Sequence, residues 1–592
     1  MFAKVIRDSV FIKSINNLDS SSRHKYFLFF FGQVALSLLD LFGLMCIGTL
    51  AALSVSGVQS ELPGSRVSRI VEFLGLEGFS FQNKVAGLAI LAMTALVTRT
   101  LLSILITRKG MSFLSFLGAR MARDLVARYS LQDRIGVLRF SEQEFLMAST
   151  RGIYALSVGI LSSAIVIVSD ASLFIVLMSA LFFVDKNLAI ISLLFFGGLG
   201  TILYFSLSRR SKSLGRREID LYASSSQKVS EGIRGYRDIF VRNAHDWQSQ
   251  RFYLQRFELA RVQANTIFTP LISKYALEIS IVIGAVLFGA YQLLLKDASA
   301  AIASLTVFLA AGVRIAPAVM RIQQSALQIK NSSGVAASAL NLIEELSVIE
   351  TNVVAEPTDE SFEGRIILKE VDFTYPLSSE PAITNATLAI QPGEKIGVIG
   401  VSGSGKSTLV DLVLGVLTPS RGSIEVSGKN PVQAIRNWPG AIGYVPQDVF
   451  ILNGTILENI VFGFQNELSS NPGNQRVYVL GILNKLGLGK WINSLENGLD
   501  TKIGENHVGL SGGQKQRLGI ARAIYTNPQV LILDEFTSAL DRETANEVVK
   551  LIEESLPQTT ILMISHDPEL MRNFDIVIEI SSGSLKEVKR KL

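Results

Sequence analysis

The sequence predicts a multidomain membrane protein, in which an all-α transmembrane domain of six helices is followed by an α/β domain. Apolar runs long enough for helices that cross a bilayer are found before residue 321. From residue 365 the pattern changes to short β-branched runs with helical segments between them, which is typical of an α/β domain. The change of pattern places a helical extension and a polar linker at residues 321–364.

Composition supports this division and excludes several functions. The chain has 592 residues, of which 48% are hydrophobic and 18% charged, so it is too long for one domain and too apolar for an ordinary soluble protein. Cys46 is the single cysteine and there are four histidines, which excludes an internal disulfide and disfavours a thiolate metal cluster. The net charge of +5 comes from bases that cluster beside the apolar runs, so we expect no nucleic-acid partner.

The six apolar runs are interpreted as membrane spans that follow a cytoplasmic N-terminus at residues 1–25. The first run is about 30 residues long, well beyond the roughly 7 to 15 apolar residues of a signal peptide, so we expect it to be retained. The predicted spans cover residues 26–55, 85–107, 157–184, 187–208, 272–295 and 299–320.

Basic residues indicate the orientation of these spans. Lys and Arg are dense in the two long segments 108–156 and 209–271, whereas the short connections hold few. Because Lys and Arg near span ends favour the cytoplasmic side, both termini, both long segments and the α/β domain at residues 365–592 are predicted to be cytoplasmic. Each long segment must turn back near its middle, around residues 132–145 and 235–248.

The first outer connection contains the stretch SRVSRIVEFLGLEG. Val67, Ile70, Val71 and Leu74 stand at helical spacing within it. This spacing predicts either a short amphipathic helix on the membrane surface or a helix packed within the loop, and the pattern leaves both open.

A glycine-rich loop in the C-terminal domain, GVSGSGKST, fits the pattern G-x-x-x-x-G-K-[ST]. It follows the strand-like run KIGVIG and precedes an apolar helical run, a context that separates it from an ordinary tight turn. In such a loop, backbone N–H groups and a helix N-terminus converge on phosphate oxygens. We expect the loop to bind ATP through Gly400, Val401, Ser402, Gly403, Ser404, Gly405, Lys406, Ser407 and Thr408.

Two carboxylates follow the apolar strand-like run in VLILDE. Asp534 stands at the end of the run, where it and the Ser407 hydroxyl are expected to bind Mg²⁺. Glu535 comes next and is placed to polarise a water molecule, while Lys406 is expected to reach the β and γ phosphates. The expected cofactors are therefore ATP and Mg²⁺, and Glu535 is the expected catalytic carboxylate.

A second glycine-rich stretch, LSGGQ, precedes VLILDE and SALD, and this series resembles the signature, Walker B and D-loop motifs of the ATP-binding cassette (ABC) transporter family. Six spans followed by one cassette resemble the half-transporter layout of exporters in that family. In the family each ATP lies between the phosphate loop of one subunit and the signature of the other. The resemblance therefore implies a homodimer in which Ser511, Gly512, Gly513 and Gln514 contact ATP in trans.

Other positions gain roles from the same resemblance. Tyr375 resembles the aromatic residue that stacks on adenine, and Gln447 resembles the Q-loop glutamine that contacts Mg²⁺. His566 resembles the switch histidine at the γ-phosphate. The resemblance therefore implies that Gln447 and His566 act in catalysis beside Glu535.

The resemblance also bears on coupling to the membrane domain. Glu505 resembles the acidic residue that contacts the partner's cytoplasmic loops, and in the family the turns of those loops dock on the cassettes. Two positions depart from the family pattern: Phe536 stands where alanine is usual, and Asp567 follows the histidine where exporters often have arginine. Neither departure removes a catalytic group.

Ionisable residues inside or near the predicted spans bear on the substrate. Charge inside a bilayer costs about 2.5 to 3.5 kcal/mol per residue on insertion scales, so such residues must face protein or water. They can form internal ion pairs, or they can line a polar cavity whose arginines hold an anionic head group. The residues are Asp40, Arg99, Asp170, Glu278 and Arg314.

The positions of these five residues, together with VRIAPAVMRIQ in the sixth span, resemble the flippase of lipid-linked oligosaccharides in bacterial protein N-glycosylation. The resemblance implies a polyprenyl-pyrophosphate-linked oligosaccharide as substrate, membrane lipid as surroundings and the cytoplasmic membrane of a bacterium as location. The arginines Arg99 and Arg314 would hold the diphosphate.

Alternatives remain open at this point. A multidrug or lipid exporter would share every motif of the cassette, and an ATP-gated channel of the same layout would differ by conducting ions. Peptide export with leader cleavage is disfavoured because only about 25 residues precede the first span and Cys46 lies within that span. The six predicted spans exclude a soluble cassette protein.

Overall fold

The computed structural model describes residues 10–16, 18–59, 72, 75, 78–184, 186–295, 298–346, 361–376, 378–464, 472–504, 509–537 and 540–590. The chain divides into two compact units, one of residues 1–131 and 139–351 and the other of residues 132–138 and 352–592. Val67, Ile70, Val71 and Leu74 of the predicted surface helix lie outside the described residues, and so does Glu505. The side chain of Arg314 lies outside them as well.

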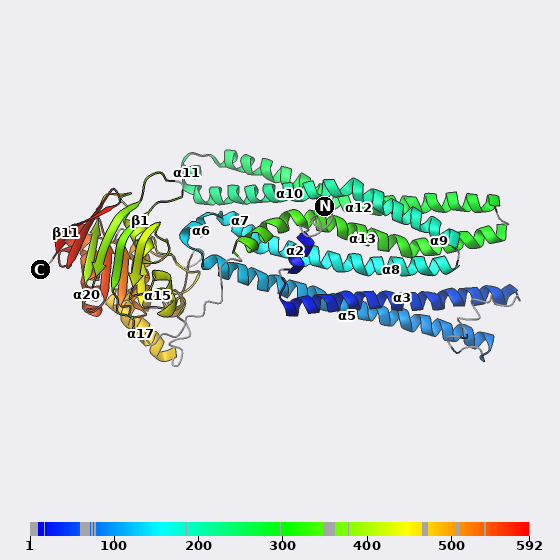
Figure 1. The fold of residues 1–592 in the computed structure, drawn as a ribbon, viewed down its shortest axis with the longest axis horizontal. Coiled ribbons are helices and arrows are strands. Elements are labelled where there is room, and N and C mark those ends of the chain that lie inside the picture. The colour runs from blue at the N-terminus through cyan, green and yellow to red at the C-terminus, as the bar shows by residue number, and fades with distance from the viewer. Residues whose placement is uncertain are drawn as a thin grey trace. The chain divides into compact units, whose positions relative to one another are not determined.

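Long helices form the first unit (Figure 1). Neighbouring helices pack in a bundle, α3 against α5 and α8, and α13 against α8, α10 and α12. The long helices are α3 (Ser20–Gln59), α5 (Phe81–Ser130), α8 (Ser163–Val184), α10 (Gly198–Arg234), α12 (His245–Leu295) and α13 (Ala298–Leu346). The shorter segments are α2 (Val10–Asn16), α7 (Glu142–Met147), α9 (Lys186–Ser192), α11 (Tyr236–Val241) and the π-helical turns η1 (Ala148–Gly152), η2 (Ala155–Ser162) and η3 (Leu193–Gly197).

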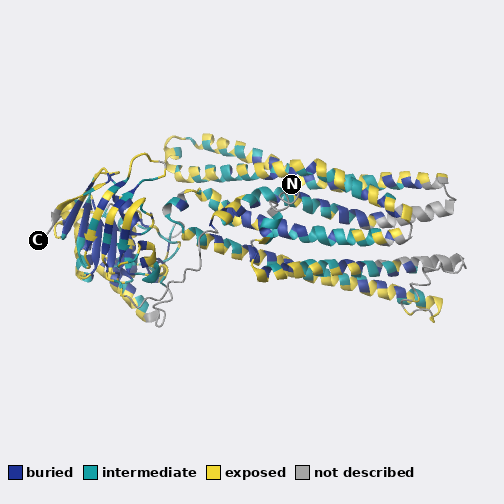
Figure 2. Cartoon of the chain, in the orientation of Figure 1, coloured by how far each residue is buried: buried dark blue, intermediate teal, exposed yellow. Residues whose placement is uncertain are grey.

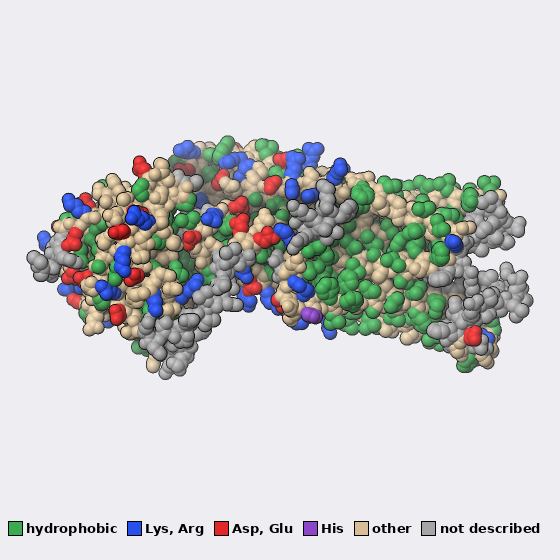
Figure 3. All heavy atoms as spheres, in the orientation of Figure 1, with side chains coloured by type: hydrophobic (Ala, Val, Ile, Leu, Met, Phe, Trp, Pro, Cys, Tyr) green, Lys and Arg blue, Asp and Glu red, His purple; other side chains and the backbone are tan. Residues whose placement is uncertain are grey.

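The surfaces of these helices fit a membrane. Among the described residues, five helical segments are long and apolar enough to cross a bilayer, and α13 runs through the sixth predicted span. Many of their apolar side chains are exposed, such as Leu194 and Val286, and hydrophobic side chains cover much of the visible helix surface (Figures 2 and 3). A helix of 50 residues such as α5 is about 75 Å long, so it extends well beyond a hydrocarbon core of about 30 Å.

Small residues allow the helices of the first unit to approach closely. A Cβ atom added to Gly159 would lie 2.5 Å from Ser332 Oγ, and one added to Gly152 would lie 2.7 Å from the Ala339 Cβ. Both glycines are in or beside the π-helical turns η1 and η2, which pack against α13. Helices in membranes associate largely through such close van der Waals contact. The contact at Gly159 therefore holds the third predicted span against α13, and the contact at Gly152 extends this packing into the segment before the span.

The second unit is built on a six-stranded sheet in the order β11-β10-β3-β9-β8-β5 and a three-stranded antiparallel sheet in the order β2-β1-β4. In the larger sheet, strands from β10 to β5 run parallel and β11 is antiparallel. The strands are β1 (Ile366–Phe373), β2 (Ile383–Ile390), β3 (Lys395–Ile399), β4 (Arg421–Val426), β5 (Ile442–Val445), β6 (Gly454–Thr455), β7 (Lys502–Ile503), β8 (Val530–Asp534), β9 (Thr560–Ile564), β10 (Ile576–Ser581) and β11 (Ser584–Arg590).

Helices accompany these sheets, so that β8 and β9 are buried along their whole length. Strands covered on both faces read as continuous apolar runs, which explains the sequences VLILD and TILMI. The helices are α14 (Lys406–Val413), α15 (Pro431–Asn437), α16 (Ile456–Val461), α17 (Pro472–Lys485), α18 (Gly489–Asn493), α19 (Gly512–Ile524) and α20 (Arg542–Ser555), with the 3₁₀ turns η4 (Gly498–Asp500) and η5 (Pro568–Met571). The short helix α6 (Arg134–Leu138), from the first predicted cytoplasmic turn, belongs to this unit, and its Ile135 packs against the hydrophobic core that includes β1 and β2.

The parallel strands determine where the predicted site residues meet. β3, β9, β8 and β5 are successive neighbours, and the carboxyl ends of parallel strands share one edge of a sheet. Gly400 follows β3, His566 follows β9 by two residues, Asp534 ends β8 and Gln447 follows β5 by two residues. The sheet therefore gathers four segments that are far apart in the sequence.

Candidate functional site

The phosphate loop has the backbone that its glycines predict. Gly405 has φ +110° just before α14, and a Cβ atom there would overlap the Ala382 carbonyl oxygen. Gly400 has φ +156°, and its Cβ would lie 2.5 Å from the Ile580 carbonyl oxygen. Both positions therefore require glycine. The loop leads directly into the N-terminus of α14, where backbone N–H groups favour an anion.

Two buried polar groups of the loop fit a phosphate ligand. Lys406 is buried and donates from Nζ to the Gly400 and Val401 carbonyl oxygens, at 2.9 and 3.1 Å. The Ser404 Oγ is buried and has no hydrogen-bond partner among the described residues. A bound phosphate would give both groups a charged acceptor. Ser402, Gly403 and Ser407 are exposed, so the rim of the loop is accessible.

Asp534 lies in an environment that fits a divalent cation. Burial raises the pKa of its carboxyl group to about 6, and the neighbouring acids Glu535 and Asp411 add to the rise, while Lys406 opposes it. A cation beside Asp534 would relieve this crowding of negative charge. No group of three His, Cys, Asp or Glu side chains that could hold a metal occurs in the described parts of the chain. Mg²⁺ is commonly bound by one or two carboxylates together with phosphate oxygens and water, so Asp534 suits a Mg²⁺–nucleotide complex.

Glu535 is the point where the predicted catalytic residues converge. Its Oε2 accepts a hydrogen bond from Gln447 Nε2 at 2.9 Å, and its Oε1 lies 2.8 Å from His566 Nε2. Lys406 Nζ lies 3.8 Å from the same Oε1. The backbone of Glu535 has φ +44°, which is costly for a residue with a side chain and is typical of functional positions. This arrangement orients a carboxylate beside the phosphate loop.

Tyr375 lies beside the same loop. Its hydroxyl is 3.1 Å from Thr408 Oγ1, and its ring meets the Phe373 ring edge-on with centroids 4.9 Å apart. These contacts hold the aromatic ring near the first turn of α14. Stacking of this ring on adenine stays a prediction.

The signature residues form a second helix N-terminus that suits an anion. Ser511 caps α19: its Oγ accepts from Gln514 N at 3.2 Å, and Gln514 Oε1 accepts from Ser511 N at 2.8 Å. Gly512 and Gly513 form the first turn without side chains that could obstruct a phosphate. None of the hydrogen bonds among the described residues joins this turn to residues 400–408.

The two departures from the family pattern have structural explanations. Phe536 is fully buried in the hydrophobic core that contains β8 and α20. Asp567 caps the 3₁₀ turn η5 through a hydrogen bond from Glu569 N, and its Oδ2 pairs with Arg542 Nε at 3.0 Å. Both side chains therefore stabilise the domain around the site.

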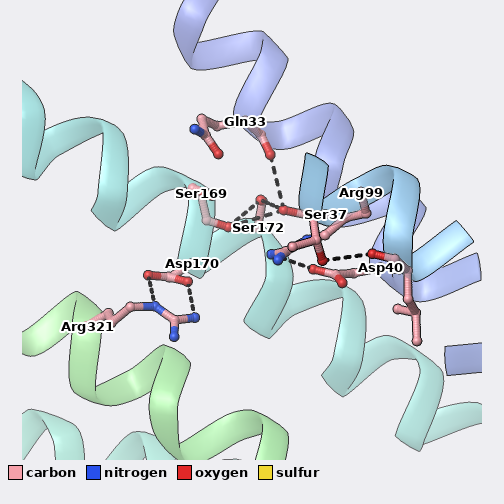
Figure 4. Close-up of polar contacts among 10 residues, drawn as sticks. Gln33, Ser37, Asp40, Arg99, Ser169, Asp170, Ser172 and Arg321 are labelled. Atoms are coloured by element: carbon pink, nitrogen blue, oxygen red, sulfur yellow. Dashed lines mark hydrogen bonds and ion pairs between the residues drawn. The ribbon is translucent and has the colours of Figure 1, made fainter. Parts of the chain in front are cut away.

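Two of the predicted acids, Asp40 and Asp170, each form an interhelical ion pair (Figure 4). Asp40 on α3 lies 2.7 Å from Arg99 on α5. Asp170 on α8 accepts two hydrogen bonds from Arg321 on α13, at 2.9 Å from Nε and 2.7 Å from Nη2. Sequence reasoning missed Arg321, which lies one residue beyond the predicted sixth span. The signal was present in VRIAPAVMRIQ, because Arg314 and Arg321 are seven residues, or about two helical turns, apart.

Glu278 does not join this group in the described structure. Its side chain is 58% exposed, and its carboxylate lies 3.9 Å from Lys274, one turn earlier on α12. The expected common set of acids is therefore divided: Asp40 and Asp170 are buried between helices, whereas Glu278 lies on an exposed face. The pairing of Asp170 with Arg321 reflects the packing of α8 on α13, which the sequence does not reveal.

A cavity of about 330 Å³ lies between α3, α5, η2, α8 and α13, beside these ion pairs. Its polar wall carries guanidinium, carboxylate, amide and hydroxyl groups, and its apolar wall carries aromatic and aliphatic side chains. Lining residues on the polar wall are Gln33, Arg99, Ser103, Ser169, Asp170 and Arg321. Ser37 adds hydrogen bonds between α3 and α8, to Ser172 Oγ at 2.9 Å and to the Ser169 carbonyl at 3.3 Å (Figure 4).

Comparison with known proteins agrees with this architecture. Residues 383–538, which contain the phosphate loop, the signature and VLILDE, match the model of the ABC transporter family. A bacterial Atm1-family ABC exporter with ATP bound has the same fold, with a TM-score of 0.72 and 18% identity over 96% of this chain and 95% of that one. The fold class is confirmed: a helical transmembrane domain precedes an α/β ABC ATPase domain.

Two kinds of named relatives are similar in sequence. The ATP-dependent lipid A-core flippase of Thiobacillus denitrificans is 31% identical over 389 residues, and that of Pasteurella multocida is 28% identical over 431 residues, 72% of each chain. A probable multidrug resistance ABC transporter ATP-binding/permease protein of Bacillus subtilis is 33% identical over 256 residues, 42% of each chain. The match spans 64% of the Thiobacillus flippase and 64% of this chain. The fold is similar to that of an ABC exporter, and the match to the ABC transporter family lies in the α/β domain.

Proposed function

We propose that the protein is an ATP-driven exporter or flippase, in which ATP hydrolysis by the α/β domain moves an amphipathic anionic substrate across the membrane. The observation that carries this proposal is the convergence of Gln447, His566 and Lys406 on Glu535 beside the phosphate loop. The apolar helices of the same chain support action at a membrane.

The chain's own groups account for the steps of hydrolysis. Residues 400–408 would hold the phosphates through backbone N–H groups and Lys406. Asp534, the Ser407 hydroxyl and the amide oxygen of Gln447 would hold Mg²⁺, which supplies positive charge beside the β and γ phosphates. The Gln447 amide nitrogen donates to Glu535, so its oxygen is available for the ion.

Glu535 would accept a proton from the attacking water, because one of its oxygens lies beside His566 and the other beside Gln447. When ATP binds, the His566 side chain would leave Glu535 and donate a hydrogen bond to a γ-phosphate oxygen. The carboxylate therefore changes partner from imidazole to water during turnover.

The active form is proposed to be a homodimer with two identical ATP sites. Ser511, Gly512, Gly513 and Gln514 present a helix N-terminus suited to a phosphate, yet no hydrogen bond among the described residues links it to the phosphate loop. A two-fold dimer would place this turn on the partner's ATP. The resemblance of the motifs to those of ABC exporters implies the same arrangement.

The proposed substrate is a polyprenyl-pyrophosphate-linked oligosaccharide in the cytoplasmic membrane of a bacterium. The polar wall of the cavity suits sugar hydroxyls and phosphate oxygens, and its apolar wall suits a lipid chain. Relatives named as lipid A-core flippases support a lipid substrate. Arg99, and Arg314 by sequence, are the proposed diphosphate ligands, and Arg321 joins them because it faces the same cavity.

A multidrug exporter is the second candidate, because the Bacillus subtilis relative carries that name. The two candidates differ in the head group that the cavity accepts. A ligand without phosphate or sugar would gain little from the guanidinium and hydroxyl groups of the polar wall.

Translocation in proteoliposomes tests the proposal. Purified protein would be reconstituted with a short-chain polyprenyl-pyrophosphate glycan, and ATP-dependent appearance of the glycan on the opposite leaflet would be measured by lectin binding. One control uses liposomes with the Glu535→Gln variant, and another uses liposomes with a dye that multidrug exporters transport. Ion current would be recorded separately across a bilayer that contains the unaltered protein. Glycan transfer that requires ATP and Glu535 supports the flippase. Dye transfer without glycan transfer would indicate a multidrug exporter instead of a flippase. Ion current would indicate a channel.

A further inference from the structure

The helix that begins with the signature also holds the segment that carries Gln447. Gln516, Gly519 and Arg522 are spaced three residues apart on α19, so they lie along one side of the helix. This side faces the end of β5 and residues 446–450 beyond it.

Three contacts join the two elements. Gln516 Nε2 donates to the Gln447 carbonyl oxygen at 2.8 Å, and the Gln516 side chain is only 4% exposed. A Cβ atom added to Gly519 would lie 2.6 Å from Val449 Cγ2, so the helix backbone touches that buried side chain. Arg522 Nη1 donates to the Phe450 carbonyl oxygen at 2.9 Å.

The hydrogen bond from Gln516 is linked to the carboxylate of Glu535 through a single residue, Gln447. Gln447 receives a hydrogen bond on its backbone from Gln516 and gives one from its side chain to Glu535 Oε2, at 2.9 Å. The preceding residue, Pro446, has a fixed φ angle and reduces the freedom of the backbone at this point. The Gln447 side chain itself is exposed, so its backbone anchor is what restrains it.

We propose that Gln516 is a positioning residue for hydrolysis: its buried amide holds the Gln447 backbone so that the Gln447 side chain stays on Glu535. The inference rests on the proposed ATPase activity. Gln516 acts through Gln447 and touches no nucleotide. Because Gln516 belongs to the helix that Ser511 caps, a movement of the signature turn would also move Gln447 in the same subunit.

Two substitutions of similar size separate a hydrogen-bond role from a packing role. Gln516→Met keeps the volume but has no donor. Gln516→Glu is nearly isosteric, and in its ionised form it places a carboxylate oxygen against the Gln447 carbonyl. When protonated, the same carboxyl group donates a hydrogen bond. Burial raises the pKa of a carboxyl group, so protonation is reached at mildly acid pH.

The experiment measures kcat and KM for ATP, nucleotide binding and thermal unfolding of the full-length protein in lipid, between pH 5.5 and 8. At pH 8 we expect both variants to lose about tenfold in kcat, or about 1.4 kcal/mol, with KM nearly unchanged. Relative to the unaltered protein at each pH, Gln516→Glu should recover toward pH 5.5 and Gln516→Met should not.

Gln475→Met is the matched control. Gln475 is another partly buried glutamine of the same domain, and its Nε2 donates to the Tyr525 hydroxyl at 3.1 Å. This variant should hydrolyse ATP like the unaltered protein, although it loses a comparable hydrogen bond.

Two results would overturn the inference. One is an unchanged kcat in both Gln516 variants. The other is equal loss in both without recovery of Gln516→Glu at low pH, which would make Gln516 a packing residue only. Failure of the unaltered protein to hydrolyse ATP would instead contradict the proposed function.

Discussion

Glu535 in the α/β domain and Asp170 in the transmembrane domain are both largely buried carboxylates, yet their partners differ. Asp170 is bound by the two parallel N–H groups of Arg321, an arrangement that satisfies both oxygens with a permanent charge. Glu535 meets a neutral amide, a titratable imidazole and a more distant ammonium group. A carboxylate fixed by arginine therefore suits a structural or substrate-binding role, whereas one held by exchangeable partners suits proton transfer.

The largest expected effect comes from removing the charge of Glu535. Glu535→Gln keeps the size and hydrogen bonding but removes the group that accepts a proton, so kcat should fall by about 10²- to 10⁴-fold while ATP still binds. Steady-state hydrolysis and nucleotide binding would be measured together. Glu553→Gln is the control, because Glu553 is another partly buried glutamate of the domain, 3.4 Å from Lys395. Normal turnover in Glu535→Gln would transfer the role to another residue.

The next effect concerns the Asp170–Arg321 pair. Arg321→Ala leaves Asp170 without its guanidinium partner and should lower stability, by less than the roughly 3 to 5 kcal/mol of a fully buried pair because Arg321 is 45% exposed. The double variant Arg321→Ala with Asp170→Asn should recover stability, as measured by thermal unfolding.

Flipping by the same double variant separates the two roles of Arg321. If Arg321 binds the diphosphate, the stable double variant should still fail to move the glycolipid. Recovery of flipping together with stability would show that the pair is purely structural. Arg99→Ala paired with Asp40→Asn tests the second ion pair in the same way.

The raised pKa of Asp534 predicts a dependence on pH. Its pKa of about 6 in the folded protein exceeds the ordinary 3.8, so ionising it costs stability above about pH 4, and the cost reaches its full value above about pH 6. Mg²⁺ favours the ionised form, so affinity for Mg²⁺-ATP should fall as pH is lowered through about 6. Titrations between pH 5 and 8 would measure this. Asp534→Asn should remove the dependence, and an equal pH dependence in that variant would assign it to the nucleotide.

The smallest effect is expected at Glu278. Its exposed pair with Lys274 should contribute about 0 to 1 kcal/mol, so Glu278→Gln should leave unfolding and flipping nearly unchanged. The matched comparison is Asp170→Asn, at a buried position. A loss of flipping in Glu278→Gln as large as that of Asp170→Asn would place Glu278 in the substrate path after all.

The sequence could predict the groups of the nucleotide site because each lies at a fixed offset from a strand or loop. Glycines with positive φ and a lysine at the start of a helix are local requirements, so Gly400–Thr408 could be assigned from spacing alone. The convergence of Gln447, Glu535 and His566 depends on the strand order β3-β9-β8-β5, which local patterns do not contain.

The transmembrane cavity was less predictable for a related reason. Asp40 and Asp170 stand out as charges in apolar runs, but their partners are chosen by how α3, α5, α8 and α13 pack. Arg321 was missed because it lies at the polar end of a run, where a charge is ordinary unless its spacing of seven residues from Arg314 is considered. Gln516 was missed because a glutamine in a helix is ordinary until its contact with the Gln447 backbone is seen.

The left-handed backbone of Glu535 lowers the stability of the fold at a residue that the proposed ATP hydrolysis needs. At φ +44°, glycine is the residue that relaxes the chain, so Glu535→Gly would relieve strain while abolishing the proton acceptor. Selection for heat resistance alone would therefore favour loss of the proposed proton acceptor at this position. A directed-evolution screen on this protein must score ATP turnover in every round, or it will enrich inert variants that survive heating better than their parent.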